Sequence, residues 1–206
     1  MIWRIAVLAL TATILMVQAA PRKELVYRTT PQGELKIHIF YPENAGAIEK
    51  RPAIVFFFGG GFRTGSPRQF FSKARYFASR GMITASAEYR VSERHKTTPV
   101  ESIEDCRAAV AWMKQNAAAH GIDPVRVAAG GGSAGGTCAM DTYFSDKPEE
   151  RPSALVLFNP AIGFKGGEVV DPAKLFQGKL PSTIMFFGSN DPLLIPARAF
   201  TQTANK

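Results

Sequence analysis

The stretch Val125-Arg-Val-Ala-Ala-Gly-Gly-Gly-Ser-Ala-Gly-Gly-Thr137 decides how this chain folds. Residues 125–129 predict a short strand and residues 134–143 predict a helix, so Ser133 stands at the turn between them. The small residues around Ser133 let the strand and the helix approach closely. The amide N–H groups at the start of the helix then point at the serine hydroxyl, where negative charge develops during nucleophilic attack. We predict that Ser133 is a nucleophile; a glycine-rich turn without chemistry is the alternative.

Apolar segments of strand length alternate with amphipathic segments on both sides of this turn. Continuous apolar runs between turn signals predict buried strands, strict alternation over residues 35–39 predicts a half-buried one, and helical spacing predicts helices. This order is typical of an α/β domain with a mostly parallel sheet, whose ligands lie at the carboxyl ends of the strands. The predicted strands are residues 35–39, 53–58, 82–87, 125–129, 154–158 and 183–187, and the predicted helices are residues 70–80, 99–120, 134–143 and 196–206.

The helix predicted at residues 99–120 has the clearest start signal. Thr98-Pro99-Val100-Glu101 combines a capping box with proline at the first helical position. Asp105 lies on this helix, and Arg90 follows the strand that ends at residue 87. We expect Arg90 and Asp105 to form a buried ion pair that ties the intervening loop to the helix.

A second glycine-rich segment, Phe58-Gly59-Gly60-Gly61, follows a predicted buried strand. Glycines there allow backbone N–H groups to face a bound carbonyl oxygen without side chains in the way. In this order and spacing, the segment and the Gly-Gly-Ser-Ala-Gly turn resemble the hormone-sensitive-lipase-like and acetyl-xylan-esterase-like branches of the α/β-hydrolase superfamily, from about residue 50 to the end of the chain. Those branches carry His-Gly-Gly-Gly in the oxyanion loop and often Gly-x-Ser-Ala-Gly-Gly at the nucleophile.

The resemblance implies a three-layer α/β-hydrolase fold and gives the first glycine segment a role. It implies that the amide groups of Gly60, Gly61 and Ala134 form the oxyanion hole. Phe58 stands where the family usually has histidine, and that histidine normally orients the loop by hydrogen bonds. This departure leaves the rigidity of the loop open, whereas the amide groups do not depend on that side chain.

The resemblance also implies a catalytic acid. Asp191, in Gly188-Ser-Asn-Asp-Pro192, directly follows the predicted strand at residues 183–187, where the triad acid of the family lies. An Asx turn before proline is the alternative interpretation of this segment. Three further aspartates are weaker candidates because no predicted strand places them at the carboxyl edge: Asp141, Asp146 and Asp171.

No histidine stands where the resemblance implies the catalytic base. The order in the family is serine, acid, histidine, and no histidine follows Asp191. His38 lies on an early outer strand, and His120 precedes a strand, which places it at the wrong edge of the sheet. His95 follows the strand at residues 82–87 and is the internal candidate. We therefore expect a C-terminally truncated chain that lacks a last strand and helix, with the histidine between them.

The first 19 residues are set apart from the domain. Met1-Ile-Trp-Arg4 is a short basic start, residues 5–17 are apolar or small, and Val17-Gln-Ala19 fits a cleavage site. The apolar stretch is short for a membrane span, which needs about 20 residues. We predict a signal peptide at residues 1–19, one domain at residues 20–206, and a secreted or periplasmic protein without stable membrane association. An uncleaved anchor or a core helix is the alternative interpretation of the N-terminal stretch.

The composition supports a globular domain and argues against several other classes. Of the 206 residues, 46% are hydrophobic and 20% are charged, which is too apolar for a disordered chain. The net charge of +8 comes from scattered lysines and arginines, so no nucleic-acid surface is expected. No zinc-type Cys/His spacing occurs, and no metal or other cofactor is implied. Cys106 and Cys138 both fall on predicted helices, which favours two buried thiols over a disulfide.

These features predict a serine carboxylic-ester hydrolase that forms an acyl-enzyme at Ser133. The expected substrates are short-acyl esters of a small molecule or of an acetylated polysaccharide. Two alternatives stay open. The same residues can serve an amidase or a peptidase relative, because a fold does not fix its substrate. The chain can also be a non-catalytic binding module that has lost its base. The sequence leaves the oligomeric state open.

Overall fold

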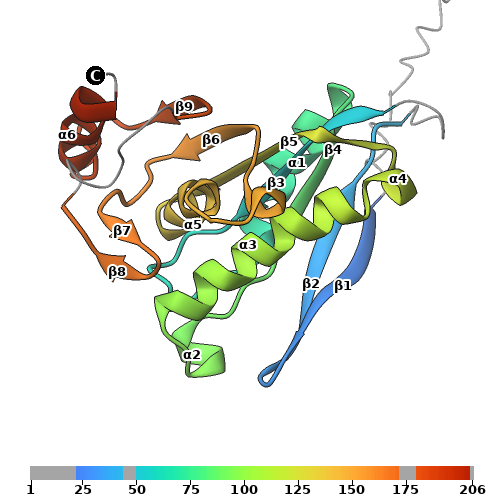
Figure 1. Cartoon of the computed structure of the whole chain (residues 1–206), viewed down its shortest axis with the longest axis horizontal. Coiled ribbons are helices and arrows are strands. Elements are labelled where there is room, and N and C mark those ends of the chain that lie inside the picture. Colours follow the sequence, from blue (N-terminus) through green and yellow to red (C-terminus); the bar gives the residue numbers. More distant parts are fainter. Residues whose placement is uncertain (1–21, 44–49, 172–179, 205–206) are drawn as a thin grey trace, which may run out of the picture.

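A seven-stranded sheet forms the centre of the protein, in the order β1-β2-β4-β3-β5-β6-β9 (Figure 1). The structure is a computed structural model that describes residues 22–43, 50–171 and 180–204. From β4 to β9 in this order the strands run parallel, whereas β1 and β2 form an antiparallel hairpin that joins β4 antiparallel. The strands are β1 (Arg22–Thr30), β2 (Gly33–Phe40), β3 (Arg51–Phe57), β4 (Ile83–Ala87), β5 (Ile122–Gly132), β6 (Ala154–Phe158) and β9 (Ser182–Phe186).

Helices cover both faces of this sheet and produce three layers. α3 and α5 lie together on one face, and α1 lies on the other, where the Thr84 hydroxyl of β4 donates a hydrogen bond to the Ala74 carbonyl at 2.8 Å (Figure 1). Two short strands, β7 (Phe164–Lys165) and β8 (Glu168–Val169), form a separate hairpin. The helices are η1 (Pro67–Phe70), α1 (Phe71–Ser79), α2 (Ser92–His95), α3 (Pro99–Gln115), α4 (Ala117–His120), α5 (Ala134–Tyr143), η2 (Pro148–Glu150) and α6 (Leu194–Ala204).

The structure confirms the predicted α/β class, and each predicted strand and helix is present. The helix at residues 134–143 and the strand at residues 154–158 have the predicted ends, and the other elements differ at one or both ends. The helix expected at residues 99–120 is two helices, because α3 ends at Gln115 and α4 begins at Ala117. β5 is longer than expected and runs through the glycines to Gly132. Glycine suits that strand because a Cβ atom on Gly130 would lie 2.7 Å from the Val156 carbonyl oxygen. The sequence did not predict β1 or the β7–β8 hairpin.

β9 lies exposed at the edge of the sheet, whereas its apolar run taken by itself predicts a buried strand. Within the described residues β9 pairs only with β6, so it forms an edge of the sheet. The side chains of Ile184 and Phe186 are 49% and 48% exposed. An apolar run predicts a strand from its own composition, but burial also requires neighbours on both sides.

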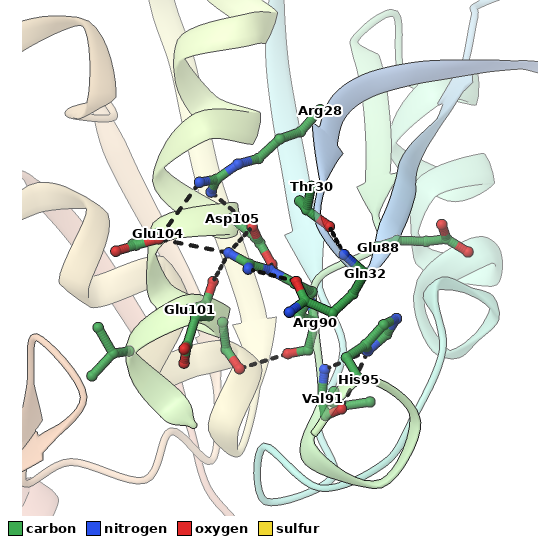
Figure 2. A network of polar contacts seen from close by, with 12 residues as sticks. Arg28, Thr30, Gln32, Glu88, Arg90, Val91, His95, Glu101, Glu104 and Asp105 are labelled. Atoms are coloured by element: carbon green, nitrogen blue, oxygen red, sulfur yellow. Dashed lines mark hydrogen bonds and ion pairs between the residues drawn. The ribbon is translucent and has the colours of Figure 1, made fainter. Parts of the chain in front are cut away.

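The predicted ion pair between Arg90 and Asp105 is present and almost fully buried (Figure 2). Arg90 donates to the Asp105 carboxylate from Nε at 2.8 Å, from Nη2 at 3.0 Å and from its backbone amide at 2.9 Å. Arg28 of β1 donates to the same carboxylate at 2.7 Å. The hydrogen bond to Asp105 raises the pKa of the Arg90 guanidinium. The pair therefore joins the loop after β4 to α3 and also to the β1–β2 hairpin.

Cys106 of α3 and Cys138 of α5 are both buried and free, as the sequence favoured. Burial raises the pKa of the Cys106 thiol well above its usual value. A thiol in this state is not a nucleophile at neutral pH. The cysteines thus belong to the packing between the two helices.

The predicted signal peptide at residues 1–19 lies outside the described residues, and the described part of the domain begins with β1 at Arg22. Export of the protein therefore stays a prediction. Among the helices that the structure describes, none is both long enough and apolar enough to cross a membrane.

Candidate active site

Ser133 lies at the tip of a tight turn between β5 and α5. Its backbone has φ 51° and ψ −122°, a strained conformation that residues with a side chain rarely adopt. Hydrogen bonds fix the turn on both sides. The Ser133 amide donates to the Phe158 carbonyl at 3.0 Å, and the Ser133 carbonyl accepts from the Thr137 amide at 3.0 Å. The turn therefore has the geometry that its sequence predicted.

Glycines around this turn are required because other atoms occupy the space where a side chain would begin. A Cβ atom on Gly135 would lie 2.2 Å from the Phe57 carbonyl oxygen. One on Gly131 would lie 2.3 Å from the Gly135 carbonyl oxygen. One on Gly59 would lie 3.2 Å from the Ser133 Cβ atom. The glycine loop after β3 and the turn at Ser133 are therefore in direct contact.

The residues predicted to form the oxyanion hole lie around this contact. Gly60 lines the same pocket as Ser133 and has φ 138°, which favours glycine. Gly61 follows with φ 63° and does not line the pocket. Ala134 is buried and is the first residue of α5, so its amide has no acceptor within the helix. Whether the three amides converge on one oxyanion stays a prediction.

Aromatic stacking and two hydrogen bonds hold the glycine loop in place. Phe58 is fully buried, and its ring stacks on Tyr89 with 4.0 Å between the centroids. The Tyr89 hydroxyl donates to the Phe58 carbonyl at 2.6 Å, and burial raises its pKa, which keeps it a donor. The Gly59 amide donates to Gln69 Oε1 at 2.5 Å. These contacts anchor a loop whose rigidity the sequence left open, and the sequence alone did not indicate Tyr89 or Gln69.

A pocket of about 560 Å³ opens in front of Ser133. Phe70 and Phe158 give it aromatic walls, and Asn159 places an amide beside them. Asn159 directly follows β6 and has φ 39°, so the rule that sites form at carboxyl strand ends could have found it. The pocket is lined by Gly59, Gly60, Thr64, Gly65, Gln69, Phe70, Lys73, Gly132, Ser133, Phe158 and Asn159.

Asp191 lies in the turn between β9 and α6 and does not line this pocket. Its Oδ1 atom accepts a hydrogen bond from the Leu193 amide at 2.9 Å, and its carbonyl accepts one from the Leu194 amide at 3.0 Å. These contacts are those of an Asx turn, the alternative that the sequence left open. Its role as the triad acid stays a prediction.

The three weaker aspartate candidates lie elsewhere. Asp141 of α5 is fully buried; it accepts from Arg107 Nη2 at 2.5 Å and from the Gly166 amide at 2.6 Å. Asp146 lines a different pocket, and Asp171 is exposed. The part of the chain that the structure describes contains no group of three or more His, Cys, Asp or Glu residues that could hold a metal ion.

His95 lies beyond β4 on α2, as expected, but it does not line the Ser133 pocket. Its Nδ1 atom accepts a hydrogen bond from the Val91 amide at 2.9 Å, so the ring closes its own helical turn (Figure 2). The same loop carries Arg90, which binds α3. The geometry therefore gives His95 a local structural contact.

The other two histidines are also separate from the Ser133 pocket. His120 ends α4, before β5, and its Nδ1 atom lies 2.7 Å from the Tyr41 hydroxyl. His38 lies on β2 with its ring 5.0 Å from that of Phe71. Burial lowers the pKa of both imidazoles. All three histidines of the chain are described, and the structure brings none of them to Ser133.

Comparison with known proteins identifies a family and several relatives of this chain. The BD-FAE family model matches residues 37–150, more than half of the chain. The neuroligin-like protein glit-1 of Caenorhabditis elegans is 33% identical over 142 residues, which are 66% of this chain and 18% of that protein. Esterase LipI of Mycobacterium tuberculosis is 32% identical over 110 residues, which are 53% of this chain and 34% of LipI. The matched part is thus about a third or less of these curated relatives.

A solved structure extends the likeness over nearly the whole chain. Esterase 2 of Thermogutta terrifontis, phosphonylated by cyclosarin, superposes with a TM-score of 0.81 and 33% sequence identity. The match covers 92% of this chain and 81% of that one. It confirms the α/β-hydrolase fold that the sequence resemblance implied. This chain therefore belongs to the BD-FAE family of α/β-hydrolases, and its matched relatives include carboxylesterase-type hydrolases.

Proposed function

We propose that this chain is a serine carboxylesterase that cleaves short-acyl esters through an acyl-enzyme at Ser133. One observation carries the proposal: Ser133 has positive φ at the start of α5 and shares a pocket with the glycine loop after β3. A helix N-terminus and a glycine loop on either side of a hydroxyl are suited to stabilising an oxyanion. The likeness to an esterase that is phosphonylated by cyclosarin gives independent support.

In the proposed reaction the Ser133 Oγ atom attacks the ester carbonyl carbon while its proton passes to a base. The carbonyl oxygen becomes an oxyanion that accepts hydrogen bonds from the amides of Gly60, Gly61 and Ala134. One such donor typically contributes about 3–4 kcal/mol. When the intermediate collapses, the alcohol leaves with a proton and the acyl group stays on Ser133. Water then repeats the sequence and releases the acid.

The base is the element of this reaction that the described residues do not supply. An imidazole oriented by Asp191 is the base that the family resemblance implies. Since no histidine lines the pocket, a second candidate function has its own support, a non-catalytic α/β-hydrolase domain that binds a ligand at the same place. The two candidates differ in whether Ser133 is activated, which can be measured directly.

We favour esters of a short acyl group with a sugar as the substrate class. The aromatic rings of Phe70 and Phe158 offer an apolar wall for an acyl chain. Thr64, Gln69 and Asn159 add polar groups to the same lining, and such groups can bind sugar hydroxyls. Acetyl esters of a polysaccharide combine these two features. The same lining also admits an amide, so anilides should be compared with esters.

The test is covalent labelling of Ser133 with a fluorophosphonate probe. We expect the protein to be labelled, the Ser133→Ala variant to be unlabelled, and hydrolysis of 4-nitrophenyl acetate to follow the same pattern. Ser79→Ala is the matched control, because that hydroxyl is exposed on α1 and donates only to the Tyr76 carbonyl at 2.7 Å. Full labelling of the Ser133→Ala variant would show that the nucleophile is misassigned.

Added imidazole separates the two candidate functions. If the serine and the oxyanion hole are formed but the base is absent, labelling of Ser133 is slow and rises with imidazole concentration, while the Ser133→Ala variant does not respond. Folded protein that is never labelled, with or without imidazole, supports the non-catalytic candidate. Circular dichroism of each variant ensures that loss of labelling is not loss of folding.

A further inference from the structure

The pocket in front of Ser133 contains one charged side chain, that of Lys73. The rest of its lining consists of glycines, two aromatic rings and uncharged polar groups, and no carboxylate lines it. A neutral ester has no anionic group that could pair with this charge. The charge on Lys73 therefore indicates a substrate property, its charge, that neither the fold nor Ser133 specifies.

Lys73 lies close to the reacting centre. Its Nζ atom is 5.7 Å from the centroid of the Phe70 ring. That ring also lies next to the turn at Ser133, because a Cβ atom on Gly132 would lie 3.4 Å from Phe70 Cζ. Phe70 is itself fixed by stacking on Phe56, with 5.1 Å between the centroids. The ammonium group and the turn at Ser133 thus lie next to the same anchored aromatic ring.

No acidic side chain neutralises Lys73 within the described residues, where its ammonium makes a contact with the Phe70 ring but no ion pair. A second cation lies beside the pocket. Arg94 donates from Nη1 to the carbonyl of Gly65, a lining residue, at 2.8 Å. The nearby Arg63, in contrast, is paired with Glu93 at 3.2 Å. Lys73 and Arg94 therefore place two positive charges at or beside the pocket.

We propose that Lys73 selects esters that carry a carboxylate several bonds from the scissile carbonyl, an inference that rests on the proposed esterase function. A positive side chain at a pocket rim attracts an anionic substrate and fixes its orientation. The carboxylate can belong to the acyl part, as in a half-ester of a dicarboxylic acid, or to the alcohol part, as in the acetyl ester of an acidic sugar. Lys73 recognises the same group in both.

Binding is measured first, in the Ser133→Ala background, so that no turnover is needed. Monomethyl glutarate and methyl valerate have chains of similar length and differ in one carboxylate. NMR titration should give a lower Kd for the glutarate, and Lys73→Gln should reduce this preference by about three- to fivefold, the size typical of an exposed ion pair. Lys73→Glu should invert it. Salt at 0.5 M should weaken the preference, because exposed charges are screened.

Arg75→Gln is the matched control. It removes the same charge from the same helix, but Arg75 lies over the Phe40 ring, outside the pocket lining. We expect it to leave both Kd values unchanged. Equal Kd values for the two esters, or equal effects of Lys73→Gln and Arg75→Gln, would overturn the assignment of Lys73.

Hydrolysis then separates the two sources of the carboxylate in the protein that keeps Ser133. Mono-4-nitrophenyl glutarate is compared with 4-nitrophenyl valerate for the acyl part, and 7-acetoxycoumarin-3-carboxylate with 7-acetoxycoumarin for the alcohol part. The pair whose kcat/KM ratio falls in Lys73→Gln identifies the side that Lys73 contacts. If no ester is turned over while the binding preference persists, the esterase proposal fails and the anion site stands. If neutral esters are turned over and no preference for the carboxylate is found, the esterase proposal stands and the anion site at Lys73 fails.

Discussion

The backbone at Ser133, with φ 51° and ψ −122°, costs energy that the surrounding residues must offset. The offset comes from the hydrogen bonds of Ser133 to Phe158 and Thr137, and from glycines that let β3, β5 and α5 approach. At the scale of single residues the site thus depends on the absence of side chains as much as on their presence.

Gly135→Ala should abolish the folded state or destabilise it by about 3 kcal/mol or more, because overpacking against fixed backbone leaves no room to relax. The new methyl group would lie 2.2 Å from the Phe57 carbonyl oxygen and 2.3 Å from that of Phe58. Gly188→Ala is the control, with its nearest atom at 3.9 Å. Urea denaturation compares the two; equal midpoints would contradict the packing described here.

Asp105→Ala should cost about 3–5 kcal/mol of unfolding free energy, because it leaves the buried Arg90 guanidinium without its carboxylate. Glu104→Ala is the control, because it removes a carboxylate at the neighbouring position. Glu104 is half exposed, and its contacts to Arg28 and Arg90 are longer, at 3.5 and 3.6 Å. The control should change stability by less than about 1 kcal/mol. A variant of Asp105 that unfolds at the wild-type urea concentration would show that the pair contributes no net stability.

At the scale of elements, α3 is stabilised by a local capping signal at its start and by tertiary contacts in its middle. Its first turn has both halves of the capping box: the Val100 amide donates to the Thr98 hydroxyl, and the Thr98 amide donates to the Glu101 carboxylate at 2.8 Å. Pro99 follows the cap as predicted. The middle of the helix, by contrast, is held by Asp105 and Cys106, which contact other elements.

Thr98→Ala should destabilise the protein by about 1 kcal/mol through loss of the cap. The effect should depend on pH. The hydrogen bond from the Thr98 hydroxyl lowers the pKa of Glu101 below its usual value, so this contact stabilises the fold above pH 4.5 and is lost as the pH falls through the lower folded-state pKa. Thermal melts at pH 7 and pH 3 should therefore show a larger difference between wild type and variant at pH 7. An equal difference at both would exclude the Glu101 contribution.

The positions of most strands and helices were predictable because each is indicated by its own sequence pattern. The buried strands, the capping box and the Ser133 turn all follow from residues that are adjacent in sequence. β1 escaped prediction because it is mostly exposed and is held by its pairing with β2 and by contacts such as the hydrogen bond from Tyr27 to the Glu88 carbonyl at 2.6 Å. The anchors of the glycine loop escaped for the same reason, since Tyr89 lies 31 residues from Phe58.

At the scale of the molecule, the two edges of the sheet differ. The β1–β2 hairpin ends one side and carries charged groups, including the pair between Lys36 and Glu24 at 2.8 Å (Figure 1). Among the described residues β9 ends the other side and presents the apolar side chains of Ile184 and Phe186. An apolar edge offers unpaired backbone groups to other chains, whereas charged side chains discourage such pairing.

Ile184→Lys should therefore reduce aggregation of the described domain with little loss of stability, because the side chain is already half exposed. Val125→Lys is the control: Val125 is 75% exposed, but β5 lies inside the sheet. Light scattering of concentrated protein should fall for Ile184→Lys and stay unchanged for Val125→Lys. A similar fall in both would indicate a general effect of charge.

The sequence by itself determined the α/β class, the positions of most elements, the turn at Ser133 and the ion pair of Arg90 with Asp105, because each depends on local pattern or on adjacent elements. The tertiary structure decided the rest. It decided that Tyr89 and Gln69 anchor the glycine loop, and that no histidine of the chain lines the Ser133 pocket. Those outcomes depend on contacts between residues that are distant in sequence, and a local sequence pattern does not specify such contacts.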